Sequence, residues 1–321
     1  MRVLILGGTG FSGPHIARGL SELGHLVTVF HRGRTRADLP AGVREVLGDT
    51  ADLPAELRRL QPDVVIHMWA FTEDDAKRFL EVFRGHAGRA VVISSCEVYR
   101  AYGKLHLAEA GPPDPIPLDE DAPLRESRYL YRDRKDLSID TTFYDKVLVE
   151  QALIAQSGLP VTILRYPGVY GPHDPYRRFQ SWLDQMAAGD EIRIAEDYAA
   201  WRWTSGYVED VATAAVLAAT QDRAAGRIYN VGALHSPTTA EIIEELGRAS
   251  GWQGRVLAVP PSEIPEEQRS PHPHDFSHHI AIDTGRIRGE LGYREIVPRD
   301  EGLRRTIQWE RALRDSASGS Q

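Results

Sequence analysis

Short apolar runs alternate along the first half of the chain with segments whose apolar residues recur at helical spacing. Each run has the length of a buried strand, and each intervening segment has the pattern of an amphipathic helix. The runs are Val3–Leu6, Leu26–Phe30, Val64–Ile66, Ala90–Ile93 and Val161–Leu164. Strands and helices that alternate in this way form a parallel sheet with helices on both faces. We therefore predict an α/β protein with a doubly wound parallel sheet of the Rossmann type.

The alternation loosens after Gly171, where loops and helices replace it. Apolar runs return at Val208–Val211 and Ile228–Val231, and a segment rich in Pro and His follows at 260–279. From these breaks we predict a first domain over residues 1–170 and 205–235. A smaller, discontinuous α/β lobe is predicted over residues 171–204 and 236–314. Residues 315–321 are small and polar, and we expect them to fray.

A glycine-rich turn follows the first predicted strand. It reads Gly7-Gly8-Thr9-Gly10-Phe11-Ser12-Gly13 and leads directly into the first predicted helix. In such a turn Gly7 permits the tight bend, Gly10 lets a pyrophosphate approach the backbone, and Gly13 lets the helix pack closely on the strand. The helix N-terminus offers amides and a positive dipole end to the phosphates. The segment predicts a dinucleotide site, and a purely structural turn is the alternative.

Basic residues stand at the end of the second predicted strand, where an enzyme that binds NAD normally carries an acid for the ribose. The segment is His31–Arg34, with Arg36 close behind. Guanidinium groups match a 2′-phosphate, so we favour NADP, bound by Arg32, over NAD. With NAD as the cofactor, these arginines would be a solvated loop. Asp49 and Thr50 follow another short strand, where the Asp49 carboxylate either accepts the adenine amino group or lies in an ordinary surface turn.

Composition and charge narrow the class of protein. The chain has 321 residues, 38 Lys+Arg against 46 Asp+Glu and a net charge of −8, which argues against nucleic acid as a partner. Its single cysteine, Cys96, excludes an internal disulfide framework and a zinc site made of thiolates. No apolar run approaches the roughly 20 residues of a membrane span. We expect a cytoplasmic protein without a membrane partner.

Several motifs occur in the order typical of the extended short-chain dehydrogenase/reductase superfamily, which contains NAD-dependent epimerases and dehydratases of nucleotide sugars. Besides the glycine turn they are Val65–His67, Ser94–Tyr99, Lys146–Glu150, Leu164–Pro172, Tyr207–Val211 and Tyr229–Gly232. The chain resembles this superfamily over nearly its whole length. The resemblance implies a small-molecule substrate and a homodimer built on helices that flank the sheet. It also implies cofactor contacts from Phe11, Ser12, Met68, Lys146, Tyr166 and Val169.

The chemistry of that superfamily uses a Ser or Thr after the fifth strand, and a Tyr four residues before a Lys on the next helix. Ser95 and Lys146 match, but Thr142 stands where the Tyr belongs. An aliphatic hydroxyl is far less acidic than a phenol, so Thr142 is a poor general base. Tyr144 lies about 200° from Lys146 on an ideal helix, so we expect it to face elsewhere unless a bulge or a displaced helix start turns it inward. Other candidate replacements are Tyr99, Tyr129 and Tyr131.

Cys96 and Glu97 directly follow Ser95. Sugar dehydratases of the superfamily carry an Asp or Cys and then a Glu at these positions. In that interpretation Glu97 removes a proton next to a transient ketone and Cys96 assists elimination, which suits a carboxylate whose pKa is raised by burial. In the other interpretation, Glu97 is a carboxylate at the rim of the site and Cys96 is a small core thiol.

Two other features of the sequence bear on ligand binding. Four histidines, at 272, 274, 278 and 279, crowd into a segment that carries prolines at 271 and 273. The rigidity of proline argues against converging metal ligands, so we predict no metal. Arg202, between Trp201 and Trp203, is a candidate contact for a phosphate or carboxylate. It lies one residue further from Asp210 than the nucleotide-sugar pattern of the superfamily would place it. A sugar nucleotide is therefore only one of the substrates to consider.

Together these features predict an NAD(P)-dependent epimerase, dehydratase or reductase that acts at a carbinol carbon of a hydroxylated small metabolite. In this hypothesis Ser95 orients the reacting oxygen, Lys146 holds the ribose, and Glu97 or Tyr144 moves protons. Thr142 leaves room for an alternative, a non-catalytic dinucleotide-binding regulator of the same fold. An RNA-associated relative is a further alternative, against which the negative charge argues.

Overall fold

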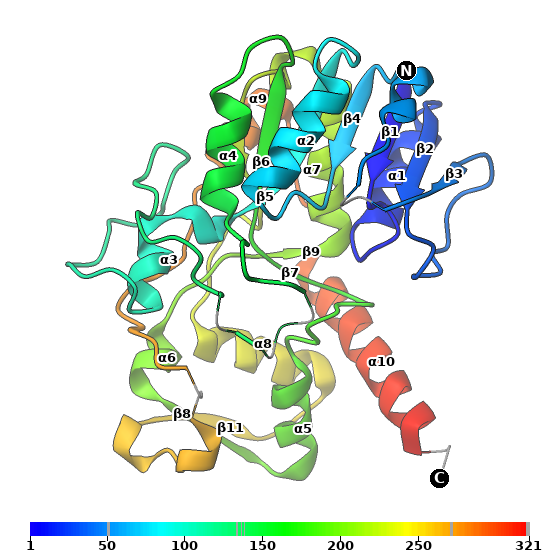
Figure 1. The fold of residues 1–321 in the computed structure, drawn as a ribbon. Helices are drawn as coiled ribbons and strands as arrows, with labels where there is room; N and C mark the ends of the chain where they lie inside the picture. Colours follow the sequence, from blue (N-terminus) through cyan, green and yellow to red (C-terminus); the bar gives the residue numbers. More distant parts are fainter. Residues whose placement is uncertain (50–51, 133, 136, 138, 270–271, 319–321) are drawn as a thin grey trace.

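The computed structural model describes residues 1–49, 52–132, 134–135, 137, 139–269 and 272–318 (Figure 1). In this part of the chain, seven parallel strands form one sheet in the order β10-β6-β5-β4-β1-β2-β3. They are β1 (Arg2–Leu6), β2 (Leu26–His31), β3 (Arg44–Leu47), β4 (Val64–His67), β5 (Arg89–Ser95), β6 (Val161–Tyr166) and β10 (Ile228–Asn230). The predicted doubly wound sheet is confirmed. Its strand order reverses between β1 and β4, where sheets of this kind bind ligands at the carboxyl ends of the strands.

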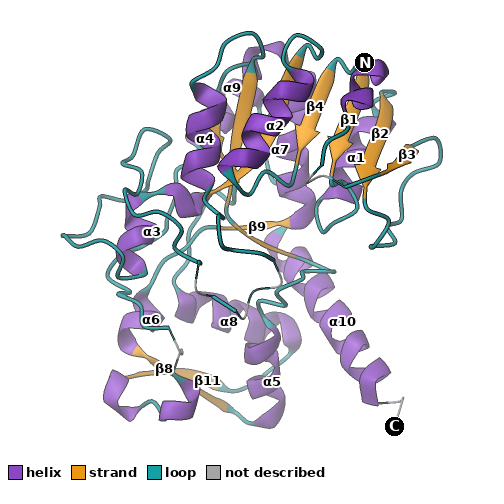
Figure 2. Ribbon diagram, in the orientation of Figure 1, coloured by secondary structure: helices purple, strands orange, loops and turns teal. Residues whose placement is uncertain are grey.

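The central strands are apolar at successive positions because helices cover both faces of the sheet (Figure 2). Val3 and Ile5 of β1 lie in one core, with α1 (Gly13–Glu22) and α7 (Val208–Thr220). Leu4 and Leu6 point to the other face and lie in a second core. The helices that pack there are α2 (Glu73–Phe83) and α4 (Lys146–Ile154).

A second lobe lies below the carboxyl edge of the sheet and has a core of its own, which includes Leu183, Ile192, Leu246 and Leu303. Its elements are α5 (Gln180–Ala188), β8 (Glu191–Ala195), α6 (Glu196–Ala200), α8 (Thr239–Ser250), β11 (Arg255–Val259) and α10 (Arg299–Ser318). The short parallel strands β7 (Gly168–Tyr170) and β9 (Ser205–Tyr207) pair beside it. The lobe is thus assembled from separated stretches of sequence.

The boundaries differ from our expectation at α9 and at the end of α10. The helix α9 (Gly285–Leu291) packs on the large sheet, with Ile287 in the core of β1, although we assigned residues 236–314 to the second lobe. The apolar run Val208–Val211 begins α7. Residues 315–318, which we expected to fray, continue α10. In the described residues, no helix combines the length and the apolar character that crossing a bilayer requires.

Candidate functional site

The glycine turn lies at the carboxyl end of β1, beside the point where the strand order reverses. Gly7 has a φ of +85°, and the Gly13 amide donates to the Gly10 carbonyl at 3.1 Å. A Cβ on Gly13 would lie 2.4 Å from the Gly8 carbonyl oxygen, so glycine alone lets α1 start this close to the turn. A Cβ on Gly10 would meet no atom within 4 Å. The turn therefore has room for a pyrophosphate next to the N-terminus of α1.

The structure places the residues expected near the adenosine end at the rim of the same edge. Ser12 is the N-cap of α1 and makes no side-chain hydrogen bond to the helix amides. Arg32 is exposed, and its guanidinium lies 5.3 Å from the centre of the Trp69 ring. Asp49 is exposed after β3. Thr50 lies outside the described residues.

Four other predicted cofactor contacts have side chains that pack against the cores. Phe11 packs against the core of the second lobe, and Met68 packs against the core that β1 forms with α1 and α7. Val169 packs against both cores. The hydroxyl of buried Tyr166 donates to the Val211 carbonyl at 2.8 Å. These contacts connect the two lobes around the turn, and a cofactor contact from any of the four stays a prediction.

A row of aromatic rings joins the glycine turn to Tyr144, and we did not predict it. Trp69 lies against the turn, because a Cβ on Gly7 would be 1.9 Å from the Trp69 Cδ1 atom. Phe71 follows at 5.0 Å from Trp69 and 5.4 Å from Tyr144 between ring centres. Their position directly after a buried strand is the sequence signal that could have identified them.

Lys146 is the first residue of α4, and its side chain runs to the carboxyl edge of the sheet. Its Nζ atom donates to the carbonyls of Ala70 at 2.7 Å and Ile93 at 3.2 Å, and lies 4.6 Å from the centre of the Phe71 ring. Burial lowers the pKa of Lys146 to about 8, and the charge of Glu97 opposes this effect. The ammonium group is therefore held between β4 and β5.

Tyr144 points into the same region, so our expectation that it faces elsewhere is wrong. The physical reason is that α4 begins only at Lys146, and the helical separation does not apply to residues that precede the helix. Tyr144 is buried, and its hydroxyl donates to Glu97 Oε2 at 3.2 Å. Thr142 is exposed and is not among the residues that line this region. The displaced helix start thus provides the phenol that the Lys-minus-four position lacks.

Asp145 determines where α4 starts. Its Oδ1 atom accepts a hydrogen bond from the Val147 amide at 3.0 Å, which caps the helix. The same carboxylate is paired through both oxygens with the buried guanidinium of Arg125, at 3.0 and 3.1 Å. Arg125 also donates to the Glu97 carbonyl at 3.0 Å. One buried ion pair therefore connects the start of α4 to the segment that carries Glu97.

Glu97 lies in a short 3-10 helix, Cys96–Val98, that follows β5. The Ser95 hydroxyl accepts a hydrogen bond from the Glu97 amide at 3.3 Å, which closes this turn. Burial raises the pKa of Glu97 above its ordinary value, and the charges of Arg125 and Lys146 oppose this rise. Burial also raises the pKa of the Cys96 thiol to about 12, so this thiol stays protonated. Glu97 is thus buried instead of lying at the rim.

Three phenols surround the Glu97 carboxylate. Besides Tyr144, the Tyr131 hydroxyl donates to Oε2 at 3.4 Å, and Tyr102 and Tyr131 share a hydrogen bond of 2.7 Å. Oε1 makes no hydrogen bond among the described residues, and it lies 3.9 Å from the buried guanidinium of Arg125. Burial raises the pKa of Tyr144 well above its ordinary value, and the Glu97 charge adds to this rise. The phenol of Tyr144 therefore keeps its proton in this site.

The two remaining candidate tyrosines lie elsewhere. The hydroxyl of buried Tyr99 donates to Asn230 Oδ1 at 2.6 Å and accepts from Arg165 at 3.1 Å. The ring of Tyr129 packs under the guanidinium of Arg132, 4.2 Å from ring centre to Cζ. Neither is among the residues that, with Ser95, Glu97 and Tyr144, line the cleft between the two lobes.

Ser95, Glu97 and Tyr144 line a cleft of about 1350 Å³ between the two lobes. Trp201 and Trp203 line it as well. The backbone from 201 to 203 is extended, so Arg202 points away from the cleft into a second cavity of about 900 Å³. There its guanidinium donates to the Ser236 carbonyl at 3.0 Å. The contact of Arg202 with a phosphate or carboxylate stays a prediction, and the structure places that side chain in the second cavity.

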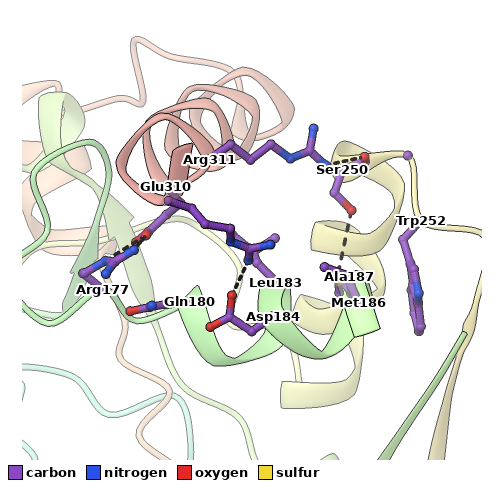
Figure 3. A pocket seen from close by; sticks show the side chains of 12 residues that line it. Arg177, Gln180, Leu183, Asp184, Met186, Ala187, Ser250, Trp252, Glu310 and Arg311 are labelled. Atoms are coloured by element: carbon purple, nitrogen blue, oxygen red, sulfur yellow. Dashed lines mark hydrogen bonds and ion pairs between the residues drawn. The ribbon is translucent and has the colours of Figure 1, made fainter. Parts of the chain in front are cut away.

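A smaller hollow of about 200 Å³ lies between α5 and α10 (Figure 3). Its charged side chains are paired with protein groups. Arg177 donates to Glu310 at 2.8 Å, Arg311 donates to the Ser250 carbonyl at 2.8 Å, and Arg314 is paired with Asp184. These paired side chains hold α10 against the second lobe, and the residues that line the hollow do not form a reactive cluster.

The histidines of residues 272–279 point to different partners. His274 lies 4.7 Å from His106 between ring centres, and His279 accepts a hydrogen bond from the Arg202 amide at 3.1 Å. His278 lies 3.4 Å from the Asp275 carboxylate. Within the described ranges, no three His, Cys, Asp or Glu side chains gather as a metal site.

The chain is similar to known proteins over most of its length. It is 25% identical to the UDP-N-acetyl-alpha-D-glucosaminuronate decarboxylase of Bacillus cytotoxicus, over 97% of this chain and 98% of that protein. It is 30% identical to the 3-diazoavenalumate denitrifying reductase of a Streptomyces species, over 83% and 84%. Its fold is similar to that of MoeE5 in complex with UDP-glucuronic acid and NAD, with a TM-score of 0.69, 21% identity and coverage of 98% and 100%. The sequence model of the NAD dependent epimerase/dehydratase family matches residues 3–232, and the chain belongs to this family of NAD-dependent enzymes.

Proposed function

We propose that this enzyme is an NADP-dependent reductase that converts the carbonyl group of a small metabolite to an alcohol. The observation that carries the proposal is the hydrogen bond from the Tyr144 hydroxyl to Glu97, in the cleft that Ser95 also lines. Because burial raises the pKa of Tyr144, the phenol keeps its proton and is suited to give it to a developing alkoxide. The test is oxidation of NADPH by the purified protein with carbonyl substrates, and its loss in Tyr144→Phe.

The residues of the chain supply binding, orientation and proton transfer. When bound, the cofactor supplies the hydride. Ser95 Oγ and Tyr144 Oη hold the reacting oxygen, and Tyr144 Oη gives it a proton. Glu97, ionised at rest, then relays a proton to the Tyr144 phenolate through Oε2, which lies 3.2 Å from Tyr144 Oη. It takes this proton from the Tyr131 hydroxyl, and Tyr102 extends the route by which Tyr131 regains a proton. Lys146 provides a positive charge at the sheet edge, where the nicotinamide ribose would lie.

A regulator without catalytic activity was the alternative that Thr142 left open. That alternative depended on the absence of a phenol near Lys146. Tyr144 provides the phenol, and the Lys146 Nζ atom lies 5.9 Å from the centre of its ring. This distance supports an enzyme.

The glycine turn fits a dinucleotide, and Gly10 offers a test that separates binding from folding. Because a Cβ there meets no atom within 4 Å, Gly10→Val is expected to leave the free energy of unfolding unchanged to within about 0.5 kcal/mol. The isopropyl group would occupy the pyrophosphate position, so the Kd for NADPH should rise at least about tenfold. Calorimetric titration and thermal melting measure the two effects. Unchanged NADPH affinity would contradict a pyrophosphate at this turn.

The preference for NADP rests on Arg32. Arg32→Ala should raise the Kd for NADPH by about 10- to 100-fold and leave the Kd for NADH nearly unchanged, because only NADP carries the 2′-phosphate. Arg44→Ala, at the exposed start of β3 on the opposite edge of the sheet, is the matched control. Equal losses of affinity for both nucleotides would mean that Arg32 does not read the phosphate.

A dehydratase is a second candidate function, favoured by Glu97 Oε1, which is buried without a hydrogen-bond partner among the described residues. A carboxylate in this state is suited to remove a proton from the carbon next to a carbonyl. The two functions differ in one measurement. A dehydratase incorporates solvent deuterium at that carbon, whereas a reductase leaves the carbon unlabelled.

We further propose that the enzyme acts in the cytoplasm as a homodimer that pairs through α4. Phe143, three residues before α4, and Ile154, its last residue, are 63% and 58% exposed, which is unusual for large apolar side chains. Sedimentation equilibrium should give twice the chain mass, and Phe143→Glu combined with Ile154→Glu should give the monomer. A wild-type protein that sediments as a monomer would contradict the dimer.

A further inference from the structure

One wall of the cleft is built of aromatic side chains. The rings of Tyr198 and Phe276 lie 4.7 Å apart between centres, Trp201 lies 5.7 Å from Phe276, and Trp201 and Trp203 are stacked at 6.1 Å. Each is half-buried and lines the cleft, so part of each ring faces it. We call the following six residues the aromatic wall: Trp182, Tyr198, Trp201, Trp203, His274 and Phe276.

The wall starts close to the reacting groups. A Cβ on Gly168 would lie 2.0 Å from the Trp203 Cζ3 atom, so the absence of a side chain there lets the indole lie against the backbone. Gly168 follows Tyr166 by two residues, and Tyr166 is the register partner of Ser95 in the sheet. The indole of Trp203 is therefore placed at the Ser95 end of the cleft.

The polar groups of the wall are engaged or uncharged. The Trp201 Nε1 atom donates to the His278 carbonyl at 2.9 Å, which leaves the indole face for the cleft. His274 packs against His106, which lies beside the wall, and burial lowers the pKa of both imidazoles, that of His106 to about 4. The wall is thus an apolar surface of ring faces.

Four described arginines line the same cleft, and the protein itself engages each of them. Arg134 has a partner within the chain, and Arg269 donates to the Ile264 carbonyl at 2.9 Å. Arg178 donates to Asp174 at 2.8 Å, and Arg193 donates to Glu263 at 2.7 Å. Arg202 points into the other cavity. A diphosphate bound here would compete with these carboxylates for the charge-assisted hydrogen bonds that hold such groups.

We propose that the substrate is an aromatic ketone, with a planar ring beside the reacting carbon, and not a sugar nucleoside diphosphate. The ring stacks on the aromatic wall, and the carbonyl oxygen reaches Tyr144 and Ser95. This inference rests on the proposed function, because it names the substrate class of the same site.

The test uses the full chain saturated with NADP⁺, with which the ketone can bind but is not reduced, and two probes, 4-hydroxyacetophenone and UDP-glucuronic acid, in calorimetric titrations. The aromatic ketone should bind, and Trp201→Leu should raise its Kd about tenfold, which is the loss expected for one stacked ring. Trp201→Phe should restore most of the affinity. Trp309→Leu, on α10 beside His173 and outside the cleft, is the matched control and should leave the Kd unchanged.

Binding of UDP-glucuronic acid without binding of the ketone overturns the inference, as does ketone binding that Trp201→Leu leaves unchanged. If neither probe binds, the inference is also overturned. Binding of NADPH, measured with the same protein, distinguishes this failure from that of the proposed function. If NADPH binds and its oxidation depends on Tyr144, the reductase stands and only the substrate class is wrong.

Discussion

Tyr144→Phe is expected to lower kcat/KM for carbonyl reduction by about 10²- to 10⁴-fold, the range for loss of a general acid. The change removes only the hydroxyl that donates to Glu97 Oε2 and keeps the ring packed between Phe71 and Tyr131. The Kd for NADPH should therefore stay the same, and the melting temperature should change little. Steady-state rates from the absorbance of reduced nicotinamide measure the effect.

Two control variants make this result specific. Thr142→Val changes the residue at the superfamily's usual position, which is exposed here, and should leave kcat/KM unchanged to within about twofold. Tyr176→Phe removes the hydroxyl of an exposed tyrosine in the same cleft and should also be silent. A large loss in Thr142→Val, with Tyr144→Phe active, would mean that a rearranged α4 returns position 142 to the site during catalysis.

Glu97→Gln should lower kcat by about 10²- to 10⁴-fold and remove the acid limb of the pH profile. In the wild type the activity should rise with pH as the Glu97 carboxylate forms, at a pH above the ordinary range for a carboxyl because burial raises its pKa. It should fall again near pH 8, where Lys146 loses its proton. The variant should keep only the alkaline limb. Asp197→Asn, an exposed carboxylate of the same cleft, should keep both limbs.

Glu97→Gln should also change the free energy of unfolding, and the direction of this change follows from the raised pKa of Glu97. The pKa of Glu97 is higher in the folded state than in the unfolded chain, so ionisation destabilises the fold. The stability that the protonated form confers is fully present below the unfolded pKa and is lost as pH rises through the folded pKa. At neutral pH the variant should be more stable than the wild type, and the difference should vanish in acid. Denaturant unfolding at several pH values measures it, and a destabilised variant at neutral pH would show that the carboxylate is well solvated or paired.

The sequence by itself determined the sheet, the glycine turn, and the positions of Ser95 and Lys146. Strands that are buried on both faces must be apolar at successive positions. A turn that brings α1 against Gly8 must have glycine at position 13. Both features therefore depend on local composition and spacing. The family resemblance added the order of the motifs. Tyr144 itself was among the candidates, but its orientation was assigned by an ideal helix geometry that the chain does not adopt there.

Only the tertiary structure decided which phenol reaches the site and what faces it. The start of α4 depends on Arg125 and Asp145, which are 20 residues apart, and the contact of Tyr144 with Glu97 joins positions 47 apart. The aromatic wall likewise joins α5, α6, residues 201–203 and residues 274–276, which lie far apart in the chain. Such contacts are made by buried side chains from segments that meet only after the lobes have packed. No local pattern encodes them, because their energy comes from burial and pairing across the fold.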